Sequence, residues 1–195
     1  MGLSGNSTDE RAVEPAQRML TESQQTQLLR QAARGDRQAF STLVDLHAQP
    51  LFRIALTLIG NRSDAEDLVQ ETLAGALESA GGFRGEASVR TWLTRILFRQ
   101  AAKQRRRNWR NRSLPIESAE QVGSPGAAGS VDRRLDVLAV LQTLSPEHRE
   151  VIVLREYQAM SYDEMAKILG VPRGTIESRL HRARQELKDK LKGYK

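Results

Sequence analysis

The stretch that most constrains the fold is residues 161–185 (SYDEMAKILGVPRGTIESRLHRARQ), which predicts two short helices joined by a tight turn. Ser161 followed by Glu164 is a capping box that begins the first helix. Gly170 suits the position just after that helix, and Pro172 suits the opening of the second. The stretch therefore predicts a helix-turn-helix.

The second of these helices has an apolar face and a polar face. Its apolar residues recur at helical spacing: Ile176, Leu180, Ala183, Leu187 and Leu191. The residues that then point away are Ser178, His181, Arg182 and Gln185. Their hydroxyl, imidazole, guanidinium and amide groups can reach base edges and phosphates from a major groove. An ordinary helical hairpin with a solvated polar face would show the same pattern, so the rest of the chain must decide.

Composition narrows the possible functions. The 195 residues fit one or two domains, and 39% apolar content suffices for two small helical cores. A net charge of +6 favours a polyanionic partner, either nucleic acid or an anionic membrane surface. The absence of cysteine excludes disulfides, zinc–thiolate sites and thiol nucleophiles. No apolar run could span a bilayer and no export signal is visible, so we expect a cytoplasmic protein without membrane insertion.

The first helices carry an apolar stripe typical of a core. Thr21 with Gln24 predicts a helix start, and Gly35 breaks this helix. A second apolar stripe follows, which Pro50 is expected to kink or interrupt. His47 is expected to be a surface or half-buried residue and not a ligand. Residues 1–20 mix small and charged residues without periodicity and predict a disordered tail.

An acidic helix follows, DAEDLVQETLAGALES, with Ser63 and Glu66 as its predicted capping box. Its outward face carries Asp67, Gln70, Glu71 and Glu78. A metal site is disfavoured because no histidine lies nearby and these side chains face water. Acidic residues in the first turns also suit the helix dipole. A protein-docking surface and this purely structural role both remain open.

A strongly basic helix is predicted from about Ser88 to Arg107. Its buried side is expected to be Val89, Trp92, Leu93, Ile96 and Leu97. Between Ala87 and Ile116 there is no acidic residue, while Arg and Lys recur and Trp92, Phe98 and Trp109 are interleaved. A one-sided basic face with aromatic residues is expected of a groove that follows phosphates and stacks bases. A membrane surface or a solvated tail is the alternative.

A flexible linker separates two helical domains. Residues 113–132 are rich in small residues, Gly and Pro, which predicts the linker and the domain boundary. The first domain then covers residues 21–112 and the second covers residues 133–195. Within the second, Ser145 is a predicted N-cap with Pro at the first helical position. The fold class is all-α, with two small helical domains.

Taken together, these residues resemble the extracytoplasmic-function (ECF) sigma factors of the sigma-70 family, from about Leu28 to Leu191. DAEDLVQET followed by FRGEASVRTWLTRIL resembles sigma region 2. LSPEHREVIVLREYQAMSYDEMAKILGVPRGTIESRLHRARQEL resembles region 4, which holds the helix-turn-helix. The resemblance implies a detachable, non-enzymatic subunit without a cofactor. It would bind core RNA polymerase and direct it to promoters by recognising the −35 and −10 elements, and it would help to melt the DNA.

The resemblance also implies roles for particular residues. Contacts to the β′ clamp helices of core polymerase are implied for Asp64, Asp67, Gln70 and Glu71. The β subunit is a further implied partner. Binding of the −10 element is implied for Phe83, Arg84, Ser88, Arg90, Trp92, Arg95, Arg99 and Lys103. Binding of the −35 element is implied for Arg173, Thr175, Glu177, Ser178, Arg179, His181, Arg182 and Arg184. Glu177 departs from the basic or small residue common in relatives, which leaves the −35 sequence open. An anti-sigma factor is a further implied partner.

Two rival functions explain less of the chain. A one-component helix-turn-helix regulator accounts for residues 161–192 but gives no role to the acidic helix or the basic aromatic helix. A nucleic-acid-processing enzyme would need a cluster of His, Cys or carboxylate side chains, and the sequence has none in evidence. The sigma-factor interpretation uses all three features.

Overall fold

The computed structural model describes residues 20–112 and 132–192, which form helices joined by short turns. The predicted tail, residues 1–20, and linker, residues 113–132, lie almost wholly outside the described residues. The N-terminal module contains α1 (Glu22–Ala33), α2 (Arg37–Ile59), α3 (Arg62–Ser79), the turn η1 (Ala80–Gly82) and α4 (Val89–Arg112). The C-terminal module contains α5 (Asp132–Gln142), α6 (Pro146–Ile152), the π-helical turn η3 (Val153–Tyr157), α7 (Tyr162–Leu169) and α8 (Arg173–Lys192). The predicted all-α class is confirmed.

Most of the predicted helix ends are confirmed because they depend on local hydrogen bonds. Thr21 and Ser161 are the N-caps of α1 and α7, each completing a capping box with the residue three positions on. Ser145 accepts a hydrogen bond from the backbone N–H of His148 and caps α6. Gly170 ends α7 in the left-handed region with φ +66°, a conformation that glycine adopts without steric cost.

Two predicted helix features are wrong. The capping box at Ser63 does not form, because α3 begins two residues earlier and the side chain of Asn61 accepts the backbone N–H of Asp64 at 3.1 Å. Of the two effects expected of Pro50, a kink or an interruption, the interruption is wrong, because α2 runs unbroken from Arg37 to Ile59. A proline removes one hydrogen bond from a helix, and here the apolar residues on both sides of it are buried in one core that holds the helix together.

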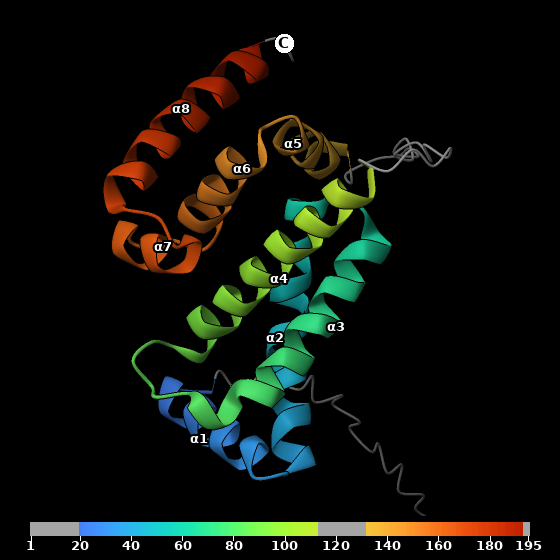
Figure 1. Ribbon diagram of the computed structural model, residues 1–195, viewed down its shortest axis with the longest axis vertical. Helices are drawn as coiled ribbons and strands as arrows, with labels where there is room; N and C mark the ends of the chain where they lie inside the picture. The colour runs from blue at the N-terminus through green and yellow to red at the C-terminus, as the bar shows by residue number, and fades with distance from the viewer. Residues whose placement is uncertain (1–19, 113–131, 193–195) are drawn as a thin grey trace, which may run out of the picture.

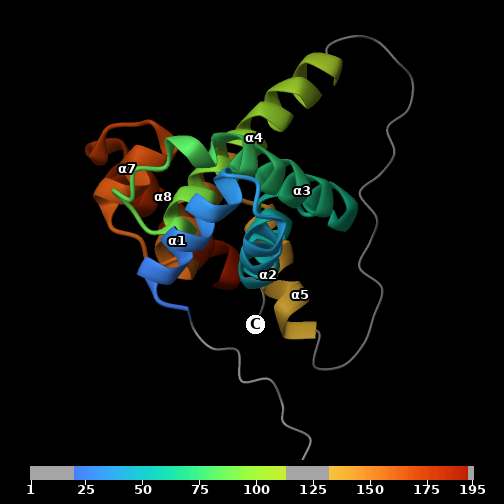
Figure 2. The same ribbon diagram turned by 90° about the horizontal axis from the view of Figure 1, so that it is seen from below.

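The two modules pack against each other. Helix α4 runs along the boundary, with α2 and α3 on one side and α6 and α7 on the other (Figure 1). Helix α5 lies beside α2 (Figure 2). A single cluster of buried apolar side chains includes members of both modules, for example Leu97 of α4 and Met165 of α7. None of the described helices is both long and apolar enough to cross a membrane.

Burial corrects three of the sequence-based expectations. His47 is only 6% exposed, whereas a surface or half-buried residue was predicted. Phe98 is 2% exposed and belongs to the core, so it cannot stack on a base. Leu191, assigned to the apolar face of α8, is 47% exposed because the last turns of α8 extend beyond the core. The inward positions Ile176, Leu180 and Ala183 are confirmed as buried, as shown by their exposed fractions of 1% or less.

Candidate nucleic-acid and protein interfaces

The acidic face of α3 is assembled as predicted from its register. Ala65, Leu68 and Val69 are buried against the core, which leaves the carboxylates of the helix outside. Asp64, Asp67, Gln70 and Glu71 line one shallow pocket of about 380 Å³ together with Gln104 and Arg107 of α4. Asp67, Gln70 and Glu71 are exposed, and Asp64 is half-buried. The helix therefore presents a contiguous acidic surface whose far edge is basic.

The loop before α4 holds an aromatic pair. The rings of Phe83 and Trp92 lie 5.2 Å apart between centroids with an interplanar angle of 59°, and both side chains are half-buried. Ser88 caps α4 by accepting the backbone N–H of Thr91 at 3.0 Å. Gly85 has φ +75°, so the loop turns through a conformation that other residues rarely adopt. This arrangement fixes an aromatic surface at the start of the basic helix.

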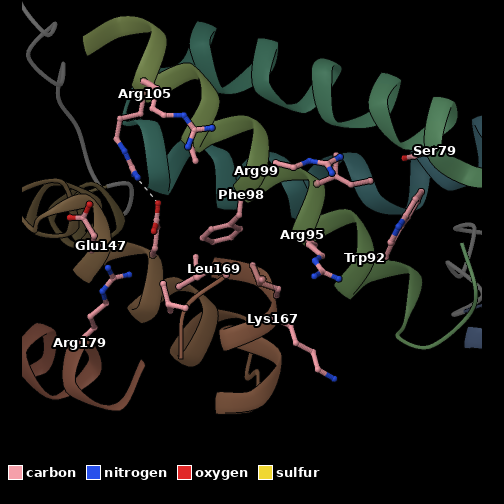
Figure 3. Close-up of a pocket in the computed structure, with 17 residues that line it drawn as sticks. Ser79, Trp92, Arg95, Phe98, Arg99, Arg105, Glu147, Lys167, Leu169 and Arg179 are labelled. Carbon is pink, nitrogen blue, oxygen red and sulfur yellow. Dashed lines mark hydrogen bonds and ion pairs between the residues drawn. The ribbon is translucent and has the colours of Figure 1, made fainter. Parts of the chain in front are cut away.

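The predicted −10 residues do not all lie together. Trp92, Arg95 and Arg99 line one cleft of about 650 Å³ (Figure 3). Lys103 lines a different pocket, beside Glu71 and Glu78 of α3. Arg84 is exposed on the loop. The basic residues of α4 are therefore divided between two faces, because Arg105 and Arg106 line the cleft with Arg95 and Arg99, whereas Lys103 lies beside the acidic helix.

Arg90 is drawn away from the stripe. Its Nε and Nη2 atoms both donate to Oε1 of Gln158, at 3.0 and 2.7 Å. Gln158 belongs to the C-terminal module and is 8% exposed. The side chain of Arg90 is therefore used in a contact between modules in this structure, which its place in the sequence did not indicate.

The second helix of the helix-turn-helix is α8, and its polar face is confirmed as exposed at Ser178, His181, Arg182 and Gln185. Two of its arginines are held by carboxylates of the same module. Arg173 donates to Glu177 at 3.0 Å and approaches Asp163 at 3.4 Å, and these contacts raise the pKa of Arg173 above its ordinary value.

Arg184 is paired in the same way, with Oε1 of Glu156 at 2.7 Å, and this hydrogen bond raises the pKa of Arg184. Arg179 differs from its neighbours because it is half-buried and lines the cleft opposite Arg95 and Arg99. Thr175 is half-buried, and its carbonyl accepts the hydroxyl of Ser178 at 3.0 Å. The side chains that could enter a DNA major groove are therefore Ser178, His181 and Arg182. The neighbouring Arg173 and Arg184 are each paired with a carboxylate.

Sequence reasoning missed the residues that join the modules. The guanidinium of Arg149 on α6 donates to Leu58 O of α2 at 2.7 Å and to the carbonyls of Leu141, Gln142 and Leu144. Gln142 donates to Thr57 O at 2.7 Å. Burial by the surrounding side chains lowers the pKa of Arg149. Its helical register placed it on the same face as Ile152, which was a signal of burial, but nothing in the sequence identified the acceptors.

The fold and these surfaces define a two-module helical protein with a helix-turn-helix and a separate acidic face on α3. Residues 43–111 match sigma-70 region 2, and residues 134–187 match sigma-70 region 4. The chain is 30% identical over 182 residues to the RNA polymerase sigma-H factor of Pseudomonas aeruginosa, covering 87% of this chain and 94% of that protein. It is 34% identical over 173 residues to the ECF sigma factor SigM of Mycobacterium tuberculosis, covering 89% and 87%.

The solved structures agree with the sequence comparisons. The sigma factor RpoE of Bartonella quintana, crystallised with the anti-sigma factor NepR, superposes with a TM-score of 0.65 at 34% identity, over 78% of this chain and 96% of that one. The chain belongs to the ECF group of the sigma-70 family. It is a non-catalytic polymerase subunit that directs promoter recognition and transcription initiation, as the sequence predicted. Sigma factors of this family bind core RNA polymerase and promoter DNA.

Proposed function

We propose that the three surfaces divide the work of this sigma factor. The acidic face of α3 docks on the β′ clamp helices of core polymerase, the loop and basic helix before residue 112 hold the opened −10 element, and α8 reads the −35 element. The observation that carries this assignment is the shared pocket of Asp64, Asp67, Gln70 and Glu71 on a basic protein. We also propose domain boundaries at residues 21–112 and 133–195, and action in the cytoplasm.

The acidic face suits a protein partner better than DNA. A like-charged surface repels phosphates, whereas complementary charge steers a protein with a basic patch towards it. Within the described residues, Asp67 and Glu71 have no ion-pair partner. Their charges are therefore available to cationic side chains of another protein.

A charge reversal tests the docking role. Asp67→Lys should weaken binding of the full chain to core polymerase at least about tenfold, a loss of about 1.4 kcal/mol. The matched control is Asp45→Lys, because Asp45 is also an exposed aspartate but lies on α2 outside the pocket. Fluorescence anisotropy of labelled protein against core enzyme gives both dissociation constants. Equal losses in the two variants would refute the docking role of this face.

For the −10 element, the cleft-facing arginines and the Phe83–Trp92 pair supply the needed chemistry. Opening a duplex costs a few kcal/mol for each unstacked base, and stacking plus phosphate contacts on a basic surface can offset that cost. Arg84, Arg90, Arg95, Arg99 and Lys103 would contact the backbone, with Ser88 fixing the start of the helix. The aromatic pair, together with this loop, would hold a displaced base.

For the −35 element, Ser178, His181 and Arg182 are the candidates for base contacts. Arg173, Arg179 and Arg184 would bind phosphates, and Thr175 would support Ser178. Because Arg173 neutralises Glu177 at 3.0 Å, Glu177 repels DNA less than a free carboxylate would. Glu177 can also accept from the exocyclic amine of cytosine if Arg173 moves to a phosphate.

Arg182→Ala distinguishes base reading from phosphate binding. If Arg182 contacts a base, discrimination at one −35 base pair should fall by about 1–3 kcal/mol while other sequences bind almost as before. Lys188→Ala is the control, since Lys188 is exposed further along the same helix. Transcription from a promoter library by the reconstituted holoenzyme measures the preference. Uniform weakening across all promoters would assign Arg182 to a phosphate instead.

An anti-sigma factor is the further partner that we propose. RpoE of Bartonella quintana is seen bound to the anti-sigma factor NepR, and this chain shares its fold at a TM-score of 0.65. A protein that covers the acidic face of α3 or the basic cleft would block polymerase or DNA by simple exclusion. Co-purification of the chain with a protein that suppresses its transcription would test this.

A further inference from the structure

One face of α4 forms a wall of the cleft between the modules. Trp92, Arg95 and Arg99 all line the cleft and recur at helical spacing, so they follow one another along the same side of the helix. At 1.5 Å per residue, Trp92 and Arg99 are separated by about 10 Å along the helix axis. An aromatic ring and two guanidinium groups are therefore arranged in a row along this wall.

The opposite wall comes from the C-terminal module and is also basic. Lys167 of α7 and Arg179 of α8 line it, together with apolar side chains such as Leu169 at the end of α7. In Figure 3 the ring of Phe98 points towards Leu169 from the side of α4. The cleft thus combines cationic groups on both walls with apolar side chains between them.

The cleft carries an excess of positive charge. Its cationic side chains are Arg95, Arg99, Arg105, Arg106, Lys167 and Arg179, and its two carboxylates are Glu147 and Glu150. Arg105 and Glu150 pair with each other at 2.8 Å. Among the described residues, Arg95, Arg99, Lys167 and Arg179 have no ion-pair partner. Like charges on facing walls repel, so an anion between them would be attracted by both walls.

The charge is distributed unevenly along the cleft. Figure 3 shows Glu147 at the Arg105 end, whereas Trp92 and Lys167 lie at the other end. The end that holds Trp92 therefore carries cations without the two carboxylates. Arginine and lysine form charge-assisted hydrogen bonds with phosphate oxygens, and an aromatic ring offers a surface on which a base can stack.

The size of the cleft favours a compact ligand. Its volume of about 650 Å³ lies within the range of about 300–1,000 Å³ that is usual for small-molecule sites. A membrane surface cannot enter a concavity with two walls, and a DNA strand with several unstacked bases needs more room. A single nucleotide with a chain of phosphates matches both the size and the charge.

We propose that this cleft binds a nucleoside polyphosphate, with its base against Trp92 and its phosphates held by Arg95, Arg99 and Lys167. The ligand is a small-molecule effector of the sigma factor. It uses two of the arginines that we assign to the −10 strand, so nucleotide and strand should compete for them. The two assignments can nevertheless fail separately, because each is measured with its own ligand.

The test is calorimetric titration of the full chain without divalent cations, so that the phosphates keep their full charge. Adenosine triphosphate is the probe, and adenosine and inorganic tripolyphosphate represent its two halves. The triphosphate should bind. Tripolyphosphate should bind about tenfold more weakly, because it has no base to stack on Trp92. Adenosine, which has no negative charge, should show no measurable binding.

Two substitutions locate the ligand. Lys167→Ala should weaken binding of adenosine triphosphate and of tripolyphosphate by about fivefold each, because both lose one cation. The matched control is Lys188→Ala, since Lys188 is also an exposed lysine of the helix-turn-helix but does not line the cleft. Trp92→Leu should weaken binding of adenosine triphosphate alone. Melting curves check that each variant is folded, and Lys167→Ala alone suffices if Trp92→Leu is not.

Several outcomes would overturn the proposal. These are no binding of adenosine triphosphate, equal affinities in Lys167→Ala and Lys188→Ala, or tripolyphosphate binding as tightly as the nucleotide. A labelled single-stranded −10 oligonucleotide, titrated in parallel, should be displaced by adenosine triphosphate. If the oligonucleotide binds and adenosine triphosphate does not, the nucleotide site is wrong and the −10 role stands. If adenosine triphosphate binds and the oligonucleotide does not, the nucleotide site stands and the −10 role is wrong.

Discussion

The two modules place their charges differently. In the N-terminal module, among the described residues, the one ionisable group in the core is His47, and the cleft-lining cations Arg95 and Arg99 have no ion-pair partner. In the C-terminal module, Arg149 and Glu150 are buried, and the exposed Arg173 and Arg184 are both paired. Arg95 and Arg99 of the N-terminal module are therefore free of ion pairs, whereas Arg173 and Arg184 of the C-terminal module are held by carboxylates of their own module.

This difference fits the two tasks that we propose for the modules. Holding separated strands requires strong, sequence-tolerant attraction to phosphates, which free arginines provide. Reading a duplex requires a helix held in a fixed orientation, and ion pairs around α8 help to orient its side chains. The comparison can be tested by removing a charge of each kind.

The largest effect is expected at the buried charge of the C-terminal module. Arg149→Met removes the donor for four carbonyls and for Oε1 of Gln142. We expect the free energy of unfolding to fall by about 3–5 kcal/mol, because buried acceptors are left unpaired. Urea denaturation followed by circular dichroism measures this loss.

The matched control for Arg149 is Arg184→Met, an arginine of the same module whose side chain is 50% exposed. Exposed ion pairs contribute about 0–1 kcal/mol, so the control should be close to wild type. A similar loss in both variants would show that the C-terminal module does not depend on buried charge more than on surface charge.

The second effect concerns the N-terminal module and depends on pH. Burial, and then the positive charge of Arg90, lower the pKa of His47 from 6.5 to about 4. As the pH falls, the His47 imidazole is protonated in the unfolded chain before it is protonated in the folded protein. The free energy of unfolding therefore falls as the pH falls from about 6.5 to about 4. At 1.36 kcal/mol per pKa unit, the loss is about 3 kcal/mol.

His47→Gln isolates this contribution, because an amide can replace the 3.1 Å contact of His47 Nε2 with Gln25 Oε1 without titrating. Unfolding free energies of the wild type and the variant should be compared at intervals from pH 7 to pH 4.5. The difference between them should change steadily as the pH falls. A difference that is constant across this range would mean that His47 is protonated equally in both states.

The sequence predicted most of what depends on local pattern. Capping at Thr21 and Ser161, the inward positions Ile176, Leu180 and Ala183 of α8 and the outward acidic face of α3 follow from spacing alone, and the structure confirms them. The capping prediction failed at Ser63 because Asn61, two residues earlier, offers an equally good acceptor. Local chemistry allows a helix start at either residue, so spacing alone did not decide between them.

The long-range contacts were beyond sequence reasoning. Arg90 and Gln158 are far apart in the chain, as are Arg105 and Glu150, and no periodicity connects them. Phe98 was assigned to base stacking because aromatic residues in a basic run suit that role. In the structure its side chain is 2% exposed and lines the cleft together with residues of the second module such as Leu169, which a pattern within one helix could not show.

The smallest expected effect is on the salt dependence of DNA binding. It contrasts Arg99, which has no ion-pair partner among the described residues, with Arg184, which is paired with Glu156. Arg99→Gln in the full chain should reduce the salt dependence of −10 strand binding by about 0.7 in log–log slope, the value for one phosphate contact on single strands. Arg184→Gln should change the slope for −35 duplex binding by less than half of that. Arg184 must leave Glu156 before it can bind a phosphate, and the released carboxylate then repels the DNA.

Titrations of the full chain at several salt concentrations measure both slopes. Equal slopes would mean that the pairing seen around α8 has no effect on DNA binding, and the contrast between the modules would then apply to their folding alone.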